Sequence, residues 1–206
     1  EPEHPLPMSD QVFDVAVLGA GPGGYAAAFR AADLGLTTAL IEPHATLGGV
    51  CLNVGCIPSK ALLSVASTLR AARALAQHGV SFGEPSIDLD ALRASKDKTV
   101  RRLTTGLAAL AKARKVEVIR GIGRFVTDRE IEVASEGPAA ATGAGVRRVR
   151  FAHCIIAVGS SALRLPGLPD DPRILDSTAA LGLPDVPARM LVVGGGIIGL
   201  ELATVY

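Results

Sequence analysis

The chain lacks an excess of charge of either sign and a long apolar run. Its 206 residues carry 21 basic and 20 acidic side chains, a formal net charge of +1. This balance gives no electrostatic reason to bind nucleic acid or an anionic membrane. No uninterrupted apolar run approaches the ~18 residues of a membrane span, and the N-terminus shows no signal pattern. We therefore expect no nucleic-acid partner, no membrane partner and a cytoplasmic location.

Cysteine is also scarce. Three cysteines in this length do not form the disulfide framework of a secreted scaffold. Cys154 lies in an apolar run, where a thiol is most simply a small buried hydrophobe. Cys51 and Cys56 are separated by four residues, and a close pair points to redox or metal chemistry. Because 49% of the residues are hydrophobic, the chain can bury a core.

The first part of the chain has the pattern of a βαβ unit. The expected elements are a buried strand at 12–18, a helix to about Leu34 and a second strand at 37–41. Gly19, Gly21 and Gly24 lie between the first strand and the helix, and Glu42 ends the second strand. This is the G-x-G-x-x-G fingerprint of a Rossmann-like fold. A glycine turn without a ligand is the alternative, but strand, helix and acid together favour dinucleotide binding.

Each glycine of this motif has a physical task. Gly19 permits the tight turn, Gly21 lets the backbone approach a pyrophosphate, and Gly24 allows the helix to pack on the strand. The phosphates would lie at the helix N-terminus, where free N–H groups and the helix dipole favour negative charge. Glu42 would accept hydrogen bonds from ribose hydroxyls.

The remaining chain alternates helical and strand patterns and then repeats its opening. We expect a helix from Pro58 to about 79, a helix at 89–113, strands at 116–119, 131–133 and 155–159, and a low-complexity loop at 137–145. Five prolines between 160 and 189 indicate an extended connection. A strand at 190–193, a turn with Gly194, Gly196 and Gly199, and a helix start follow. A strand and a helix start without a second strand cannot bury their apolar faces, so we interpret the chain as a piece of a longer protein.

The cysteine pair lies in the segment Gly48–Lys60. Cys56 falls just before Pro58 at the expected helix start, a position that favours a thiolate. With Gly55 between them, the sulfurs can come within disulfide reach, which needs Cα atoms roughly 4.4–6.8 Å apart. A structural disulfide and half a zinc site are the alternatives, but the zinc site lacks a second ligand pair and His44 alone is a poor candidate. We favour a redox-active pair and expect no metal.

The segment Gly48–Lys60 resembles the active-site signature of the flavin-dependent pyridine nucleotide–disulfide oxidoreductases, and within them it is most similar to the dihydrolipoamide dehydrogenases. The likeness continues through 19–25, 121–125, 155–160 and 194–201. One departure is Val158, which stands where the family usually has threonine. The resemblance implies an α/β chain: a Rossmann-like FAD domain, with a parallel sheet and a β-meander insertion, followed by the start of a Rossmann-like NAD domain. The expected organisation is therefore a linker or cloning remnant at 1–10, the FAD domain at 11–160, a connection at 161–189 and the truncated NAD domain at 190–206.

The same resemblance implies the cofactor sites. FAD would bind the first βαβ unit, with its pyrophosphate on Gly19, Gly21 and Gly24 and its adenosine ribose on Glu42. The other residues implied to contact FAD are Thr46, Gly48, Gly49, Cys51, Lys60, Gly123 and Gly159. The residues implied for NAD are Gly194, Gly196 and Gly199.

The catalytic roles also follow from the resemblance. Cys51 would exchange with dihydrolipoyl groups, and Cys56 would face the flavin. Lys60 would lie near flavin N5 and pair with the acid Glu201. The family's catalytic base is a histidine held by a glutamate in the partner subunit's C-terminal domain. The four histidines here match no such motif; they are His4, His44, His78 and His153.

The implied function is the oxidation of protein-bound dihydrolipoyl groups to lipoyl disulfide, with reduction of NAD⁺ to NADH. Its implied partners are the lipoyl domains of 2-oxo acid dehydrogenase complexes and a second copy in a full-length homodimer. Two alternatives are a glutathione- or mercuric-reductase-like enzyme and a flavin-binding fragment without turnover. We expect the 206 residues alone to be inactive.

Overall fold

The computed structural model describes residues 12–134 and 146–206. The linker expected at 1–10 and the loop expected at 137–145 lie outside the described residues. The chain divides into two compact units, 1–49 with 104–159 and 50–103 with 160–206. These units are groups of residues that contact one another, whereas the domain expected at 11–160 is assigned from its cofactor-binding motif. The domain boundaries therefore stay a prediction.

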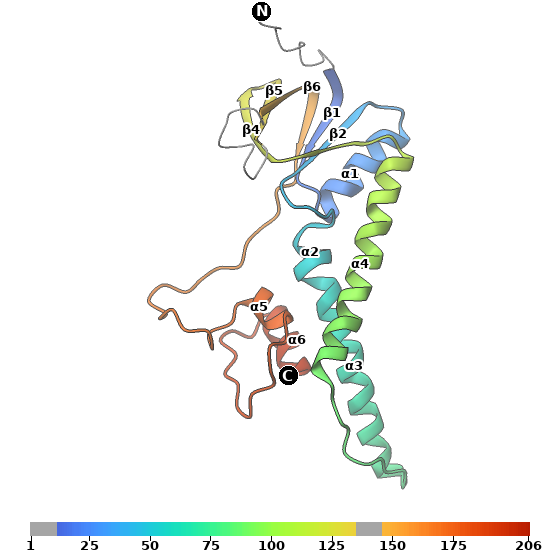
Figure 1. The fold of residues 1–206 in the computed structure, drawn as a ribbon, viewed down its shortest axis with the longest axis vertical. Coiled ribbons are helices and arrows are strands. Elements are labelled where there is room, and N and C mark those ends of the chain that lie inside the picture. The colour runs from blue at the N-terminus through green and yellow to red at the C-terminus, as the bar shows by residue number, and fades with distance from the viewer. Residues whose placement is uncertain (1–11, 135–145) are drawn as a thin grey trace, which may run out of the picture. The chain divides into compact units, whose positions relative to one another are not determined.

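The first unit is built on a six-stranded sheet with the order β3-β2-β1-β6-β5-β4 (Figure 1). Its strands are β1 (Val12–Leu18), β2 (Thr38–Glu42), β3 (Glu117–Arg120), β4 (Ile122–Thr127), β5 (Glu130–Ala134) and β6 (Val146–Ile156). β3, β2, β1 and β6 are parallel, and β5 and β4 continue from β6 as an antiparallel meander. The expected α/β fold class, a parallel sheet with a β-meander, is confirmed.

Helix α1 (Pro22–Asp33) packs on β1 and β2. Its buried face consists of Gly24, Ala28 and Ala31, small residues that let a helix approach a sheet closely. The strands bury branched and aromatic side chains in one core cluster with residues such as Ile41 and Phe151. This core fixes the end of β1, where the glycine turn begins.

The expectation of a separate buried strand at 155–159 is wrong. β6 instead runs from Val146 to Ile156, and it pairs first with β5 and then with β1. Beyond Ile156 the chain leaves the sheet after one more bond, from the Ala157 N–H to the Leu18 carbonyl at 2.8 Å. Because β1 ends at Leu18, residues 157–159 have no neighbouring strand to pair with.

The second unit is helical. Its elements are α2 (Gly49–Val54), which begins on the last residue of the first unit, α3 (Cys56–Ala74), the 3-10 helix η1 (Leu75–His78), α5 (Ser177–Leu181), α6 (Ile197–Val205) and the first part of α4 (Leu89–Ala113). The bounds of α4 are as expected, whereas α3 begins at Cys56 rather than at Pro58. Leu62 of α3 and Leu202 of α6 belong to one buried cluster with the α5 region. This cluster holds α3 against α6.

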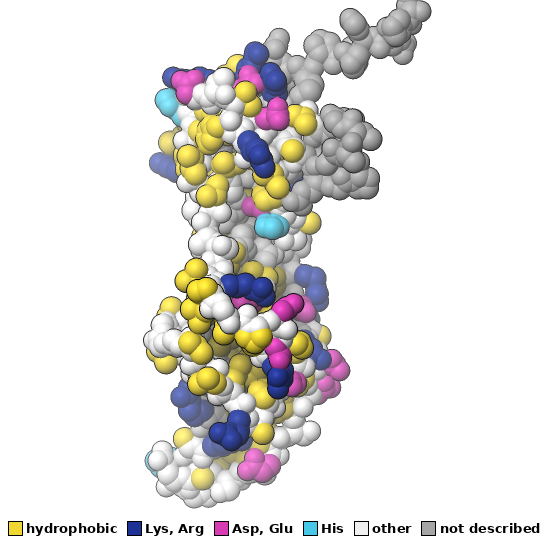
Figure 2. All heavy atoms as spheres, turned by 90° about the vertical axis from the view of Figure 1, so that its left-hand side faces the viewer, with side chains coloured by type: hydrophobic (Ala, Val, Ile, Leu, Met, Phe, Trp, Pro, Cys, Tyr) yellow, Lys and Arg dark blue, Asp and Glu magenta, His cyan; other side chains and the backbone are white. Residues whose placement is uncertain are grey.

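The second glycine motif departs from the expectation in one respect. The strand expected at 190–193 is absent from the described residues, because a strand needs a neighbour for its backbone hydrogen bonds. Leu191 and Val193 are 86% and 73% exposed. Other hydrophobic side chains are also exposed, and Figure 2 shows a face of the molecule on which they lie among charged side chains. Helix α6 forms, and it begins at Ile197 rather than at Leu200.

One helical stretch of the described residues, Gly49–His78, is long and apolar enough to cross a membrane by length and composition. The core helix of a soluble protein passes the same test. The stretch is not one continuous helix, since α2 ends at Val54 and Gly55 has non-helical dihedral angles. Broken backbone hydrogen bonds are costly in lipid, and Lys60 within the stretch is ion-paired. We infer no membrane span from it.

Asp14 links β1 to the start of β2 through hydrogen bonds to its carboxylate. Its Oδ2 accepts hydrogen bonds from the Thr37 N–H and hydroxyl, both at 2.7 Å. The Thr37 bonds hold the pKa of Asp14 below its usual range, so its stabilising effect is complete above that range and is lost as the pH falls through it to the lowered pKa of the folded protein. We expect Asp14→Asn to lower the melting temperature near neutral pH and to reduce its further loss below about pH 5. Thermal melts across pH check this; an unchanged pH dependence would contradict it.

Candidate functional site

The glycine turn after β1 is shaped by backbone atoms that leave no space for side chains. Gly19 has a φ of +98°, and a Cβ there would lie 2.3 Å from the Ala157 carbonyl oxygen. A Cβ at Gly24 would lie 1.8 Å from the Gly19 carbonyl oxygen. Only glycine fits at these two positions, so both build the turn itself.

Gly21 faces a second glycine turn at Gly48 and Gly49. It is the N-cap of α1, and a Cβ on it would meet only the Gly49 Cα, at 4.0 Å. Gly49 has a φ of +57°, and its own Cβ would come within 2.7 Å of the Gly21 Cα. The Gly48 N–H donates to the Ala20 carbonyl at 2.8 Å. The N-terminus of α1 is thus framed by bare backbone, which leaves its first-turn N–H groups accessible to an anion.

Glu42 is fixed beside this turn. It ends β2 with 4% of its surface exposed. Its Oε2 accepts from the Ala20 N–H at 2.8 Å and its Oε1 from the His44 N–H at 3.0 Å. Each carboxylate oxygen has two lone pairs, so Glu42 keeps the capacity to accept hydroxyl hydrogen bonds.

The other expected FAD contacts of the first unit are placed as follows. At Gly123 in β4, a Cβ would lie 2.6 Å from Leu18 Cδ1 and 3.1 Å from Ile131 Cγ2, so core packing alone explains the glycine. Gly159 has a φ of +76° in the segment after β6. Thr46 lies in the turn between β2 and the second glycine turn.

The structure brings the thiols of Cys51 and Cys56 together. Cys51 lies within α2 and is half-buried, and Cys56 is the first residue of α3 and is exposed. Between them, a Cβ at Gly55 would lie 2.8 Å from the Val50 carbonyl oxygen, so the close turn requires glycine. Burial, followed by the hydrogen bond with the Cys56 thiol, raises the pKa of Cys51. The two thiols are thus close enough to interact directly.

Lys60 lies one helical turn after Cys56 and pairs with Glu201 of α6. The Lys60 Nζ donates to Glu201 Oε1, and the Ser59 hydroxyl donates to Oε2. The hydrogen bond from Lys60, followed by that from Ser59, lowers the pKa of Glu201. The bond to Glu201 in turn raises the pKa of Lys60. Ser59 is the polar residue that sequence reasoning missed, because its partner lies 142 residues away.

The second glycine motif repeats the geometry of the first. Gly194 has a φ of +108°, and a Cβ at Gly199 would lie 2.8 Å from the Gly194 carbonyl oxygen. Gly196 is the N-cap of α6 in an extended conformation, as Gly21 is for α1. The local turn therefore forms although its strand does not.

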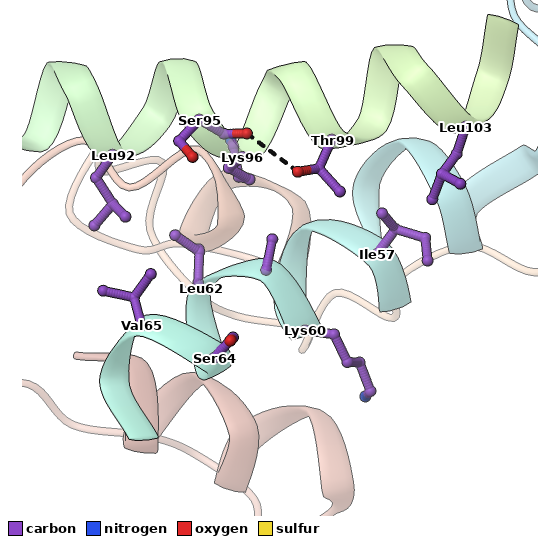
Figure 3. A pocket seen from close by; sticks show the side chains of 11 residues that line it. Ile57, Lys60, Leu62, Ser64, Val65, Leu92, Ser95, Lys96, Thr99 and Leu103 are labelled. Atoms are coloured by element: carbon purple, nitrogen blue, oxygen red, sulfur yellow. Dashed lines mark hydrogen bonds between the residues drawn. The ribbon is translucent and has the colours of Figure 1, made fainter. Parts of the chain in front are cut away.

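A cavity of about 380 Å³ lies between α3 and α4 within the second unit (Figure 3). Its wall includes Ile57, Leu62 and Val65 from α3 and Leu92, Thr99 and Leu103 from α4. Lys60 contributes to its rim and points away from α4 in this view. Neither cysteine and none of the motif glycines lines this cavity, so it is not the candidate dinucleotide site.

These features define a class of protein. A Rossmann-like glycine turn, followed by two thiols in contact at a helix start, is the arrangement of a dinucleotide-dependent disulfide oxidoreductase. The family model described as pyridine nucleotide-disulphide oxidoreductase matches residues 13–206. The chain belongs to this family, whose members use FAD and NAD.

Individual relatives carry more specific names. The chain is 56% identical over 193 residues to a dihydrolipoyl dehydrogenase of Vibrio cholerae and 54% identical to one of Haemophilus influenzae. Each match covers 93% of this chain and 39% of the relative. A leghemoglobin reductase of Vigna unguiculata is 44% identical, over 94% of this chain and 36% of the relative. The chain thus spans about two-fifths of the length of these curated relatives.

Proposed function

We propose that the protein is a dihydrolipoyl dehydrogenase, which oxidises protein-bound dihydrolipoyl groups and reduces NAD⁺. The contact between Cys51 and Cys56 at the start of α3 carries this proposal. The identity with relatives of that name supports it. Its partners would be the lipoyl domains of 2-oxo acid dehydrogenase complexes and a second copy of the full-length chain, and its location the cytoplasm.

The residues of the first glycine turn fit a bound FAD. Gly21 would leave the N-terminus of α1 open to a pyrophosphate, and the Glu42 carboxylate would accept hydrogen bonds from ribose hydroxyls. The further FAD contacts are those expected from the sequence, of which Gly123 also has a packing reason. Gly194, Gly196 and Gly199 would form the corresponding NAD turn. Bound FAD supplies a two-electron acceptor between the cysteine pair and NAD⁺.

The cysteine pair performs thiol–disulfide exchange. In the oxidised protein, a substrate thiolate attacks the Cys51 sulfur, which breaks the Cys51–Cys56 bond and releases Cys56 as a thiolate. The second substrate thiol, deprotonated in turn, attacks the substrate sulfur of this mixed disulfide. The cyclic disulfide product leaves, and Cys51 takes up a proton. The pair then holds two electrons more than before, and the substrate two fewer.

Lys60 and Glu201 support the charged state of this pair. The ammonium of Lys60 lies where it favours a thiolate at Cys51, and the ion pair with Glu201 keeps it protonated. The base that deprotonates the substrate would come from the partner subunit, as the family resemblance implies. We propose that the 206 residues alone do not reduce NAD⁺, because the strand before Gly194 is not formed.

A comparison of substrates tests the proposal. The full-length protein with FAD should reduce NAD⁺ with dihydrolipoamide as electron donor. It should reduce neither glutathione disulfide nor Hg²⁺ with NADH or NADPH at comparable kcat/KM. Turnover of either of these without turnover of dihydrolipoamide would overturn the proposal in favour of a sister enzyme.

A further inference from the structure

Ser59 occupies a buried position between Cys56 and Lys60 at the start of α3. Ser59 is only 6% exposed. Its hydroxyl donates to Oε2 of Glu201, and the adjacent Lys60 donates to Oε1 of the same carboxylate. Two consecutive residues of one helix therefore engage both oxygens of one acid on another helix.

The Ser59 hydroxyl and the Lys60 ammonium differ in how firmly they hold the Glu201 carboxylate. A lysine is a compact charge on a flexible four-carbon stem with three rotatable donors, so the ion pair alone leaves the carboxylate free to rotate. Successive side chains of a helix point about 100° apart. A carboxylate bonded to both Ser59 and Lys60 is therefore fixed in position and in plane. We call this pair of hydrogen bonds, from Ser59 and Lys60 to Glu201, the clamp. The short, buried side chain of Ser59 is its rigid donor.

We propose that Ser59 is a positioning residue: it holds Glu201 in the orientation that keeps the Lys60 ammonium beside the cysteine pair. The proposal rests on the proposed function, in which this pair exchanges with substrate thiols. Glu201 lies on α6, directly after the second glycine motif, so the same bond also ties this helix to α3.

The charges around the clamp agree with this role. The groups that act on Lys60 are Glu201 first and then the thiols of Cys56 and Cys51, and all of them raise its pKa. Lys60 reciprocally favours the thiolate of Cys51. Without Ser59, Glu201 would lose one of the two donors that lower its pKa. Glu201 and the ammonium it holds would then spend part of the time away from the cysteines.

The test is the pH dependence of cysteine alkylation. The reduced full-length protein is treated with iodoacetamide from pH 5 to 10, and the rates at Cys51 and Cys56 are read by peptide mass spectrometry. We expect Ser59→Ala to raise the midpoint for Cys51 by about 0.3–0.5 pH unit, equivalent to a two- to threefold slower reaction near neutral pH. Ser59→Thr, which keeps the hydroxyl, should restore the midpoint. Ser67→Ala is the matched control, because Ser67 is an exposed serine of the same helix.

A double variant separates positioning from packing. Because Ser59 is proposed to act through Glu201, adding Ser59→Ala to Glu201→Gln should not shift the Cys51 midpoint beyond its value in Glu201→Gln alone. An unmoved midpoint in Ser59→Ala, or equal additive shifts in the double variant, would overturn the proposal even if the melting temperature falls. Neither measurement needs turnover. Failure to oxidise dihydrolipoamide would therefore overturn the proposed function, whereas an unmoved midpoint would overturn only the role of Ser59.

Discussion

Replacing Cys51 with serine in the full-length protein should lower kcat for dihydrolipoamide oxidation at least about 1,000-fold. A serine hydroxyl cannot form the mixed disulfide through which, in the proposed reaction, the substrate gives up its electrons. Cys56→Ser should have an effect of similar size, because either substitution removes the same disulfide. The measurement is NADH formation with dihydrolipoamide under saturating NAD⁺.

Cys154→Ser is the control for this prediction. Cys154 is half-buried in β6, and burial raises the pKa of its thiol, so it is not a reactive group at neutral pH. The variant should keep activity within about twofold. If Cys154→Ser were inactive while Cys51→Ser retained turnover, the cysteine pair would not be the redox centre.

Gly24→Ala should remove FAD and destabilise the fold by about 3 kcal/mol or more. Its Cβ would lie 1.8 Å from the Gly19 carbonyl oxygen, which belongs to the backbone and cannot rotate away. Either α1 separates from β1 or the glycine turn opens, and both changes disturb the N-terminus of α1, where we propose that the FAD pyrophosphate binds. Flavin absorbance after gel filtration and the denaturation midpoint measure the two effects.

Gly23→Ala provides a matched comparison one residue away. Gly23 is exposed in the same helix, and apart from its chain neighbours and the helix's own backbone no atom lies within 4 Å of a Cβ built on it. Because alanine favours a helix over glycine by up to about 1 kcal/mol, this variant should be neutral or slightly more stable and should retain FAD. Equal losses in both variants would show that the close approach of Gly24 to Gly19 is not what the fold depends on.

Local sequence patterns predicted much of the fold. The bounds of β1 and α4 followed directly from an apolar run and from helical periodicity. β4 was missed because its burial is slight and it contains Gly123, so its identity as a strand depends on pairing with β5. The strand expected at 190–193 shows the converse case, in which a strong local pattern lacks the neighbours that it needs.

In the candidate site, too, local motifs could be predicted from the sequence, whereas contacts between distant residues could not. The glycine turns and the cysteine pair are short motifs whose chemistry is contained in the spacing of adjacent residues. The contact between Lys60 and Glu201 was expected from the family resemblance, since 141 residues separate the two. Ser59 had no such guide. Its hydrogen bond to Glu201 depends on the packing of α6 against α3, which no local sequence pattern encodes.

The most direct test of the central claim is to locate the thiols that the substrate generates. The oxidised full-length protein is mixed anaerobically with dihydrolipoamide in the absence of NAD⁺ and then alkylated. After correction for the electrons held by FAD, peptide mass spectrometry should show new labels on Cys51 and Cys56, with labelling of Cys154 unchanged. If dihydrolipoamide is oxidised and neither Cys51 nor Cys56 gains a label, this pair is not the redox centre of the protein.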